Sequence, residues 1–222
     1  ILCLYLRYGP NDYPGGLEKL LEWYSEKQKS GNVTLTVWII DNKIQEEWQG
    51  TDLATGFRLI SGNNSQREFS GFQQVIDQHN QEIGAYDVIH FVTSAFDQLY
   101  TGYRDHFSLN HLYPILHRPL CLGHMDYYED PISLMGHSSQ SWIRTCFFFM
   151  SPKVLLRLKN LNSFQEDSLF FDKDGNFLDN GNIDASYAGK IQKWLSGDQM
   201  QGVSWHGSIK DPDEFKKKAL SI

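Results

Sequence analysis

The sequence predicts an α/β fold in which helices cover both faces of a mostly parallel sheet. Short apolar runs alternate along the chain with segments whose apolar residues recur at helical spacing. Residues 33–40 are almost continuously apolar or β-branched, which is typical of a strand buried on both faces. Strands that alternate with helices favour parallel pairing, because a parallel crossover must carry the chain back along the sheet.

The N-terminal region predicts a βαβ unit. Residues 1–8 have the composition of a strand, and a run of prolines and glycines ends it. Apolar residues at helical spacing in residues 17–24 then predict a helix. The next strand, residues 33–40, stops at Asp41 and Asn42.

The middle of the chain predicts two more strands and two helices. Residues 57–60 and 87–92 have the apolar composition of strands. Ser70 and Gln73 have the spacing of a capping box and are expected to open a helix. Residues 96–107 are rich in aromatic side chains at helical spacing and predict an amphipathic helix.

The C-terminal part predicts a strand-to-helix junction and two further helices. Residues 119–122 and 145–150 are expected to be strands, and residues 151–152 (Ser-Pro) supply an N-cap and an N1 proline for the following helix. Residues 186–195 predict the next helix. Residues 211–212 (Asp-Pro) are expected to open the last one by the same capping chemistry.

Length and composition limit the classes of protein that fit. With 222 residues and 41% hydrophobic content, the chain is expected to form a single domain over residues 1–222. No apolar run approaches the roughly 20 residues that span a bilayer. A formal net charge of -7, with one short basic run at residues 216–218, argues against nucleic-acid binding. The chain begins at Ile1 inside a strand, which indicates a domain excised from a longer chain.

Polar residues stand where the second predicted strand ends. Ligands of open α/β sheets bind outside the carboxyl ends of the strands, so Asp41 and Asn42 are candidates for holding a nucleotide. Neither a Walker loop nor a Gly-x-Gly-x-x-Gly motif occurs, which argues against the common ATPase and dinucleotide sites.

Several short segments occur in an order that is informative. They are Tyr8, Asp41-Asn42, Ser61-Gly62-Asn63-Asn64, Phe69-Ser70-Gly71-Phe72, residues 86–94 (YDVIHFVTS) and residues 141–151 (SWIRTCFFFMS). In this order the chain resembles a GT-A glycosyltransferase, in particular the rhamnan-synthesis-type, family-2-like branch of bacterial polysaccharide transferases. The resemblance covers most of residues 1–195. It implies a Rossmann-like GT-A domain over the whole chain.

The resemblance implies a donor site for a nucleotide sugar at the ends of the strands. Asp41 would accept a hydrogen bond from the base, and Asn63 and Asn64 would approach ribose or phosphate. Alternatively, Asp41 caps the following turn and the asparagines only tolerate left-handed backbone. Arg67 would stabilise the donor phosphates, or else is a solvated surface arginine. The predicted donor-binding residues are Tyr8, Asp41, Asn42, Asn63, Asn64, Arg67, Ser94 and Asp97.

The chain departs from metal-dependent members of this family after residues 87–92. Carboxylates that hold Mg²⁺ or Mn²⁺ are expected there, but residues 93–97 read Thr-Ser-Ala-Phe-Asp. Three explanations compete. Asp97 or Asp126 supplies a metal ligand from a shifted position, the enzyme works without a metal, or the domain has lost catalysis. We favour metal independence or a reduced site.

Inverting glycosyl transfer needs a general base, normally an Asp or Glu near the reacting sugar. The predicted catalytic candidates are Asp184, Glu166, Asp167 and Asp126. The alternatives are a helix N-cap for Asp184 and a solvated loop for residues 166–167. Aromatic side chains can stack on the sugar rings of an acceptor, or can belong to the core. The predicted acceptor-binding residues are Tyr127, Trp142 and Trp205.

The predicted function is transfer of a sugar from a nucleotide-sugar donor to a saccharide or lipid-linked acceptor in surface polysaccharide synthesis. Dependence on Mg²⁺ or Mn²⁺ is left open. The expected location is the cytoplasm, at the inner face of the membrane, with peripheral association through other parts of the chain. The alternative is a non-catalytic nucleotide-sugar or glycan-binding module, which Thr93 and Ser94 favour. A nucleotidyltransferase is a third reading, but the expected glycine- and lysine-rich loop is absent.

Overall fold

The computed structural model describes residues 1–28, 33–99, 102, 104–158, 160–161, 167–196 and 209–219. Contacts between residues group the chain into two compact units, where the sequence predicted one domain. The division arises because each unit encloses apolar clusters of its own. The first unit consists of Ile1–Met125 and Ile143–Leu161, and the second unit of Asp126–Trp142 and Asn162–Ile222.

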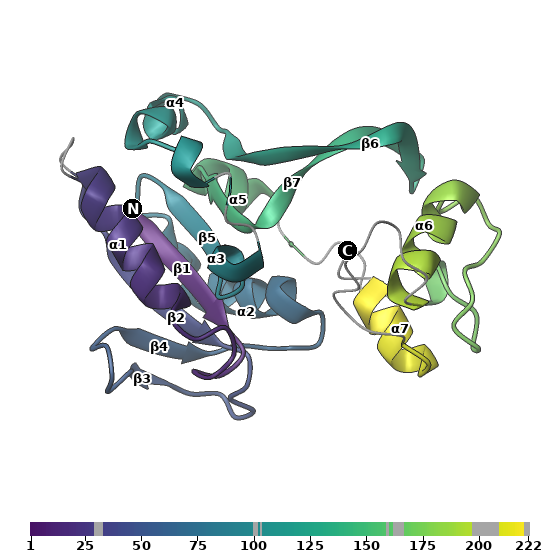
Figure 1. Cartoon of the computed structure of the whole chain (residues 1–222), viewed down its shortest axis with the longest axis horizontal. Coiled ribbons are helices and arrows are strands. Elements are labelled where there is room, and N and C mark those ends of the chain that lie inside the picture. The colour runs from purple at the N-terminus through teal and green to yellow at the C-terminus, as the bar shows by residue number, and fades with distance from the viewer. Residues whose placement is uncertain are drawn as a thin grey trace. The chain divides into compact units, whose positions relative to one another are not determined.

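A seven-stranded mixed sheet has the strand order β3-β4-β2-β1-β5-β7-β6 (Figure 1). Its core is parallel, because β1 pairs in parallel with β2 and β5, and β2 pairs in parallel with β4. β3 runs antiparallel to β4, and β7 runs antiparallel to β5. The strands are β1 (Leu2–Arg7), β2 (Thr36–Asp41), β3 (Gln49–Thr51), β4 (Arg58–Ser61), β5 (Ile89–Thr93), β6 (Cys121–Leu134) and β7 (His137–Met150).

Helices cover both faces of the parallel core, as the sequence predicted. Alternate residues of β1 face opposite ways, so that Tyr5 packs with Leu20 of α1 (Gly16–Gln28). Leu4 packs in a separate cluster with Phe72 of α2 (Arg67–Ile83) and Leu155 of α5 (Pro152–Leu158). The mostly parallel α/β architecture is therefore confirmed, with antiparallel strands added at both sides.

The segment after β5 differs from the prediction of one helix over residues 96–107. The structure gives a short α3 (Phe96–Leu99) and a 3-10 turn, η1 (Arg104–His106). Arg104 forms an ion pair with Asp97. Gly102, between these two elements, lies in a turn, so the prediction of a single helix over residues 96–107 is wrong. The chain continues through η2 (Leu109–Leu112) and α4 (Tyr113–His117).

β6 and β7 are much longer than predicted. Each extends over 14 residues, whereas the sequence predicted strands only at residues 119–122 and 145–150. The turn between them places Met135 and Gly136 at φ of 50° and 76°, the backbone of a type I′ hairpin. The outer half of β7 was missed because residues 137–141 (HSSQS) are polar, and that of β6 because residues 129–131 (Glu-Asp-Pro) interrupt its apolar residues.

Two of the three capping predictions were confirmed. The third was wrong, because α2 begins at Arg67 with Gln66 as its N-cap, so that Ser70 and Gln73 lie inside the helix and do not open it. The Lys153 N–H donates to Ser151 Oγ (3.3 Å) at the start of α5. In the second unit, the Glu214 N–H donates to Asp211 Oδ1 (2.8 Å) at the start of α7 (Pro212–Ala219). The predicted helix over residues 186–195 is α6 (Ala185–Ser196). A short 3-10 turn, η3 (Asp167–Leu169), is also part of the second unit. None of the described helices combines the length and apolar character needed to cross a bilayer.

Candidate functional site

The carboxyl ends of four parallel strands meet at one edge of the sheet, which we call the carboxyl edge. Arg7 is in register with Asp41, Asp41 with Ser61, and Leu6 with Thr93. Strands β2 and β4 lie on one side of β1, and β5 lies on the other side. The order in which strands are added to the sheet therefore reverses between β1 and β5. Such a switch point is where open α/β sheets bind ligands.

Asp41 is buried at this edge and its carboxylate is fully engaged. Arg7 Nε donates to Oδ2 (2.8 Å), while the N–H groups of Gly9 (2.8 Å) and Lys43 (3.0 Å) donate to Oδ1. Arg7 also reaches Asp52 (3.1 Å). The side chain of Asp41 is only 4% exposed. Asp41 thus ties the end of β1 to the end of β2, which is closer to the structural alternative than to direct contact with a base.

Asn42 is the second buried polar group at the carboxyl edge. Its Nδ2 donates to the carbonyl oxygen of Arg67 (2.9 Å), while its Oδ1 has no hydrogen-bond partner among the described residues. A Cβ added to Gly62 or Gly71 would overlap Oδ1, so both positions require glycine while Asn42 keeps this rotamer. Nδ2 lies 3.5 Å from Asn64 Oδ1.

Asn42, Asn63 and Arg67 are brought together around the first turn of α2. Ser70 Oγ lies 2.7 Å from the carbonyl oxygen of Asn63 and 2.9 Å from that of Arg67, and its one proton is shared between them. The Asn63 side chain accepts from the Ser65 N–H (2.7 Å). These contacts fix the loop between β4 and α2. The predicted asparagines therefore act on the backbone of this loop in the structure.

Arg67 differs from its neighbours in two ways. Its backbone is strained, and its guanidinium forms no hydrogen bond or ion pair with the described residues. Its φ of 53° lies in the left-handed region, which costs a non-glycine residue about 1–2 kcal/mol. No hydrogen bond or ion pair holds its guanidinium within the described part of the chain. Its positive charge acts on Tyr13, whose pKa burial raises and Arg67 partly lowers.

Glu68 is a residue that the sequence reasoning missed. Burial raises the pKa of its carboxyl group, and hydrogen bonds to its own backbone and to the Thr145 side chain, with the charge of Arg67, lower it in part. A carboxyl group with a raised pKa beside a cation is a feature of acid–base sites. In the sequence, Glu68 resembles an ordinary acidic residue of a first helical turn, so no signal would have found it.

The other predicted donor residues have mixed surroundings. Tyr8 is 49% exposed just beyond β1. Ser94 is buried, and its carbonyl oxygen lies 2.7 Å from where a Cβ of Gly16 would stand, so α1 begins directly against the end of β5. Asp97 is paired with Arg104. Among the described residues, no three His, Cys, Asp or Glu side chains gather as a metal site.

Most predicted catalytic and acceptor residues belong to the second unit or lie outside the described residues. Glu166 and Trp205 are outside. Asp184 is the N-cap of α6, accepting from the N–H groups of Tyr187 (2.7 Å) and Ser133 (2.6 Å). Burial raises its pKa, but these hydrogen bonds outweigh that effect and lower it. A low pKa and two occupied oxygens favour the capping role.

The remaining second-unit candidates are more accessible. Asp126, the first residue of this unit, is half-buried. Asp167 is half-exposed and lies 3.6 Å from Lys216 Nζ. Tyr127 is 71% exposed on β6. Trp142 of β7 stacks on Tyr128 with a centroid distance of 4.2 Å, so part of its ring is covered.

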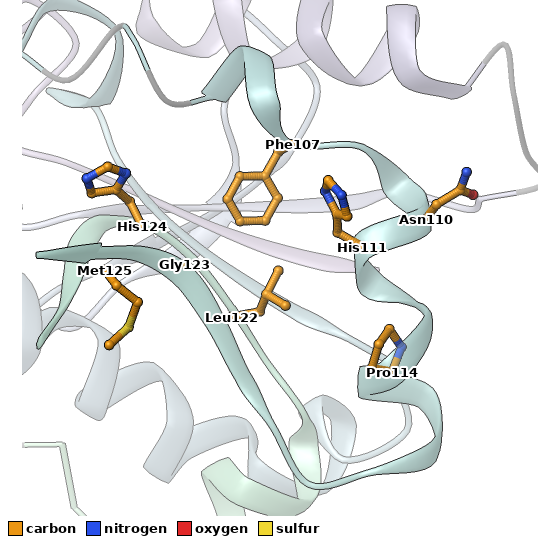
Figure 2. Close-up of a pocket in the computed structure, with 8 residues that line it drawn as sticks. All are labelled: Phe107, Asn110, His111, Pro114, Leu122, Gly123, His124 and Met125. Atoms are coloured by element: carbon orange, nitrogen blue, oxygen red, sulfur yellow. The ribbon is translucent and has the colours of Figure 1, made fainter. Parts of the chain in front are cut away.

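A pocket of about 600 Å³ lies elsewhere in the first unit (Figure 2). It is formed by η2, α4 and the first residues of β6, and none of the predicted donor-binding residues lines it. Its lining residues are Phe107, Asn110, His111, Pro114, Leu122, Gly123, His124 and Met125.

Comparisons with known proteins do not assign the chain to a family. No family model matches it, and no curated protein or solved structure gave a significant match. What the chain does therefore has to be inferred from its own residues and geometry.

Proposed function

We propose that this chain is a GT-A-type glycosyltransferase that binds a nucleotide sugar at the carboxyl edge. The observation that carries the proposal is Arg67, which lies at that edge with a left-handed backbone and whose guanidinium has no hydrogen bond or ion pair among the described residues. Strained residues persist only where the surroundings fix them, and they cluster at ligand clamps. Asn42 and Ser70 supply that fixing through the Arg67 carbonyl oxygen.

The donor phosphates are the proposed partner of Arg67. A guanidinium presents a rigid fork of N–H groups that matches phosphate oxygens, and charge-assisted hydrogen bonds are the stronger kind. In this proposal Asp41 does not touch the base. It holds the Gly9 backbone and thereby shapes the loop that borders the donor. The parallel strand order and the sequence resemblance support the same location.

Glu68 is the proposed general base. The acceptor hydroxyl attacks the anomeric carbon while the bond from that carbon to the donor phosphate oxygen breaks, and the electron pair stays on the phosphate. The hydroxyl proton passes to the Glu68 carboxylate and then to solvent. Arg67 stabilises the negative charge that develops on the leaving phosphate. A raised pKa improves a carboxylate as a proton acceptor near neutral pH.

A thermal-shift screen of nucleotide sugars, with and without Mg²⁺ or Mn²⁺, tests this proposal. Binding to the folded state alone raises its stability by mass action, so the right donor should raise Tm. Arg67→Ala should remove most of that increase, because it deletes the proposed phosphate contact. Arg157→Ala is the matched control, since Arg157 is exposed on α5. A wild-type chain with no response to any nucleotide sugar would contradict the proposal.

A second candidate is a non-catalytic module that binds a nucleotide sugar or glycan. It is favoured by the end of β5, where Thr93 and a buried Ser94 stand in place of carboxylates. The two functions differ in turnover. Release of nucleotide from a bound donor, with saccharide and lipid-linked acceptors supplied, supports the enzyme, whereas tight binding without release supports the module.

A further inference from the structure

The lining of the pocket between η2, α4 and β6 differs in charge from the chain as a whole. The chain carries a formal net charge of -7, yet none of the described residues that line this pocket is acidic. Two of them, His111 and His124, are histidines, and most of the others are apolar. A volume of about 600 Å³ is within the range of small-molecule sites.

The pocket presents imidazole rings next to aromatic and aliphatic groups. Figure 2 shows the rings of His111 and His124 on either side of Phe107, with Leu122 below them. The His111 ring meets Phe107 edge to face, at a centroid distance of 6.1 Å and an interplanar angle of 84°. The aromatic and aliphatic groups offer a surface for an apolar body, and the imidazoles stand beside it.

His111 is oriented by its own helical turn. Its Nδ1 accepts a hydrogen bond from the Ser108 N–H (3.1 Å), so the neutral ring is assigned the tautomer with its proton on Nε2. Nε2–H is then a donor for a ligand oxygen. In this tautomer His111 therefore suits a ligand acceptor or an anion.

We propose that this pocket binds an amphipathic anion, an apolar chain or ring that ends in a phosphate or carboxylate. The apolar part contacts Phe107, Leu122 and Met125, and an anionic oxygen accepts a hydrogen bond from Nε2–H of His111. Because none of the described lining residues is acidic, an anion meets less repulsion here than elsewhere on this negatively charged chain. This site stands independently of the proposed glycosyl transfer.

Calorimetric titration of the whole chain with four probes tests the proposal. Octyl phosphate combines the two features, whereas inorganic phosphate, 1-octanol and octyltrimethylammonium each lack one. Octyl phosphate should bind at least about tenfold more tightly than any of the others, because a hydrogen bond to a charged group adds enough free energy for such a factor. Equal binding of octyl phosphate and octyltrimethylammonium would overturn the proposal.

Variants locate the binding. His111→Leu keeps the volume but deletes the donor, and Leu122→Asp adds a carboxylate to the pocket. Each should weaken the binding of octyl phosphate at least about fivefold. His117→Leu is the control and should leave binding unchanged, because His117 is exposed on α4 and does not line the pocket. Unchanged affinity in the first two overturns the assignment. Because Leu122→Asp can disturb folding, circular dichroism accompanies it, and the comparison of probes on the wild-type chain needs no variant.

The anion can come from a free metabolite or from a lipid headgroup. Flotation with phosphatidylcholine vesicles containing phosphatidic acid distinguishes the two sources. Binding to these vesicles that His111→Leu reduces supports a lipid as occupant of the pocket. Binding of octyl phosphate without binding to vesicles supports a soluble amphiphile. If neither form binds, the proposal is wrong.

Discussion

Asp41 and Arg67 lie at the same edge of the sheet, and their surroundings differ in kind. Asp41 is buried, and both of its oxygens accept hydrogen bonds from the protein itself. Arg67 has a strained backbone, while its head group takes part in none of the described hydrogen bonds or ion pairs. The two residues therefore differ in role. Asp41 stabilises the ends of the strands, and Arg67 provides a positive charge at the same edge.

Asp41→Ala gives the largest expected change in stability. It leaves Arg7 with one carboxylate partner and removes the acceptor of two backbone N–H groups. Removing one partner of a buried ion pair costs about 3–5 kcal/mol. Urea denaturation should therefore show a loss of about 3 kcal/mol, and Asp41→Asn, which keeps an acceptor, should lose less. A loss below about 1 kcal/mol would mean that Asp41 is not the scaffold residue of this comparison.

Gly71→Ala tests whether Asn42 links the scaffold to Arg67. The new Cβ would overlap Asn42 Oδ1 and force the amide away from the Arg67 carbonyl oxygen. Overpacking of this kind costs about 1–3 kcal/mol, measurable as a lower urea midpoint. Gly189→Ala is the matched control, since nothing lies near its Cβ and alanine favours a helix. Equal stability of the two variants would show that the amide moves freely.

The sequence predicted the scaffold better than the site, and the difference has a physical cause. Apolar runs and helical spacing are local signals, so that the strand over residues 1–8 and the helix over residues 17–24 were predicted where β1 and α1 lie. The hydrogen-bond partners of Asp41 and Asn42 come from positions up to 34 and 25 residues away. Composition does not encode such pairings.

Helices and strands were predicted correctly where the sequence signal acts within a few residues. Caps such as Ser151 and Asp211 act within three residues, and their helices were predicted correctly. The helix predicted over residues 96–107 was wrong, because the structure has only the short α3 (Phe96–Leu99) and the 3-10 turn η1 (Arg104–His106) there. The outer half of β7, residues 137–141 (HSSQS), contains no apolar residue that could indicate a strand.

Arg67→Gly separates function from stability. Glycine relieves the left-handed strain but adds entropy to the unfolded chain, so a net gain of about 0.5 kcal/mol is expected from urea denaturation. The thermal shift produced by a nucleotide sugar should disappear. Met135→Gly provides the control, because Met135 also has a positive φ, in the hairpin of the second unit. Met135→Gly should gain similar stability and keep the thermal shift produced by the nucleotide sugar. Loss of that thermal shift in both variants would point to a general effect of glycine and not to a role of Arg67.

Glu68→Gln has the smallest expected effect on stability and depends on pH. Burial raises the pKa of Glu68 in the folded state above its ordinary value of 4.5. A raised pKa means that the folded state holds the proton more tightly, so the stabilisation is complete below pH 4.5 and is lost as pH rises through the folded pKa. Glutamine, which is always neutral, should therefore gain stability over the wild-type chain as pH rises from 4 to 7. Urea denaturation across this range measures the difference. If the difference in unfolding free energy between Glu68→Gln and the wild-type chain stays constant with pH, the pKa of Glu68 is not raised. Glu68 would then be an ordinary solvated carboxylate and not a partner of Arg67 at the carboxyl edge.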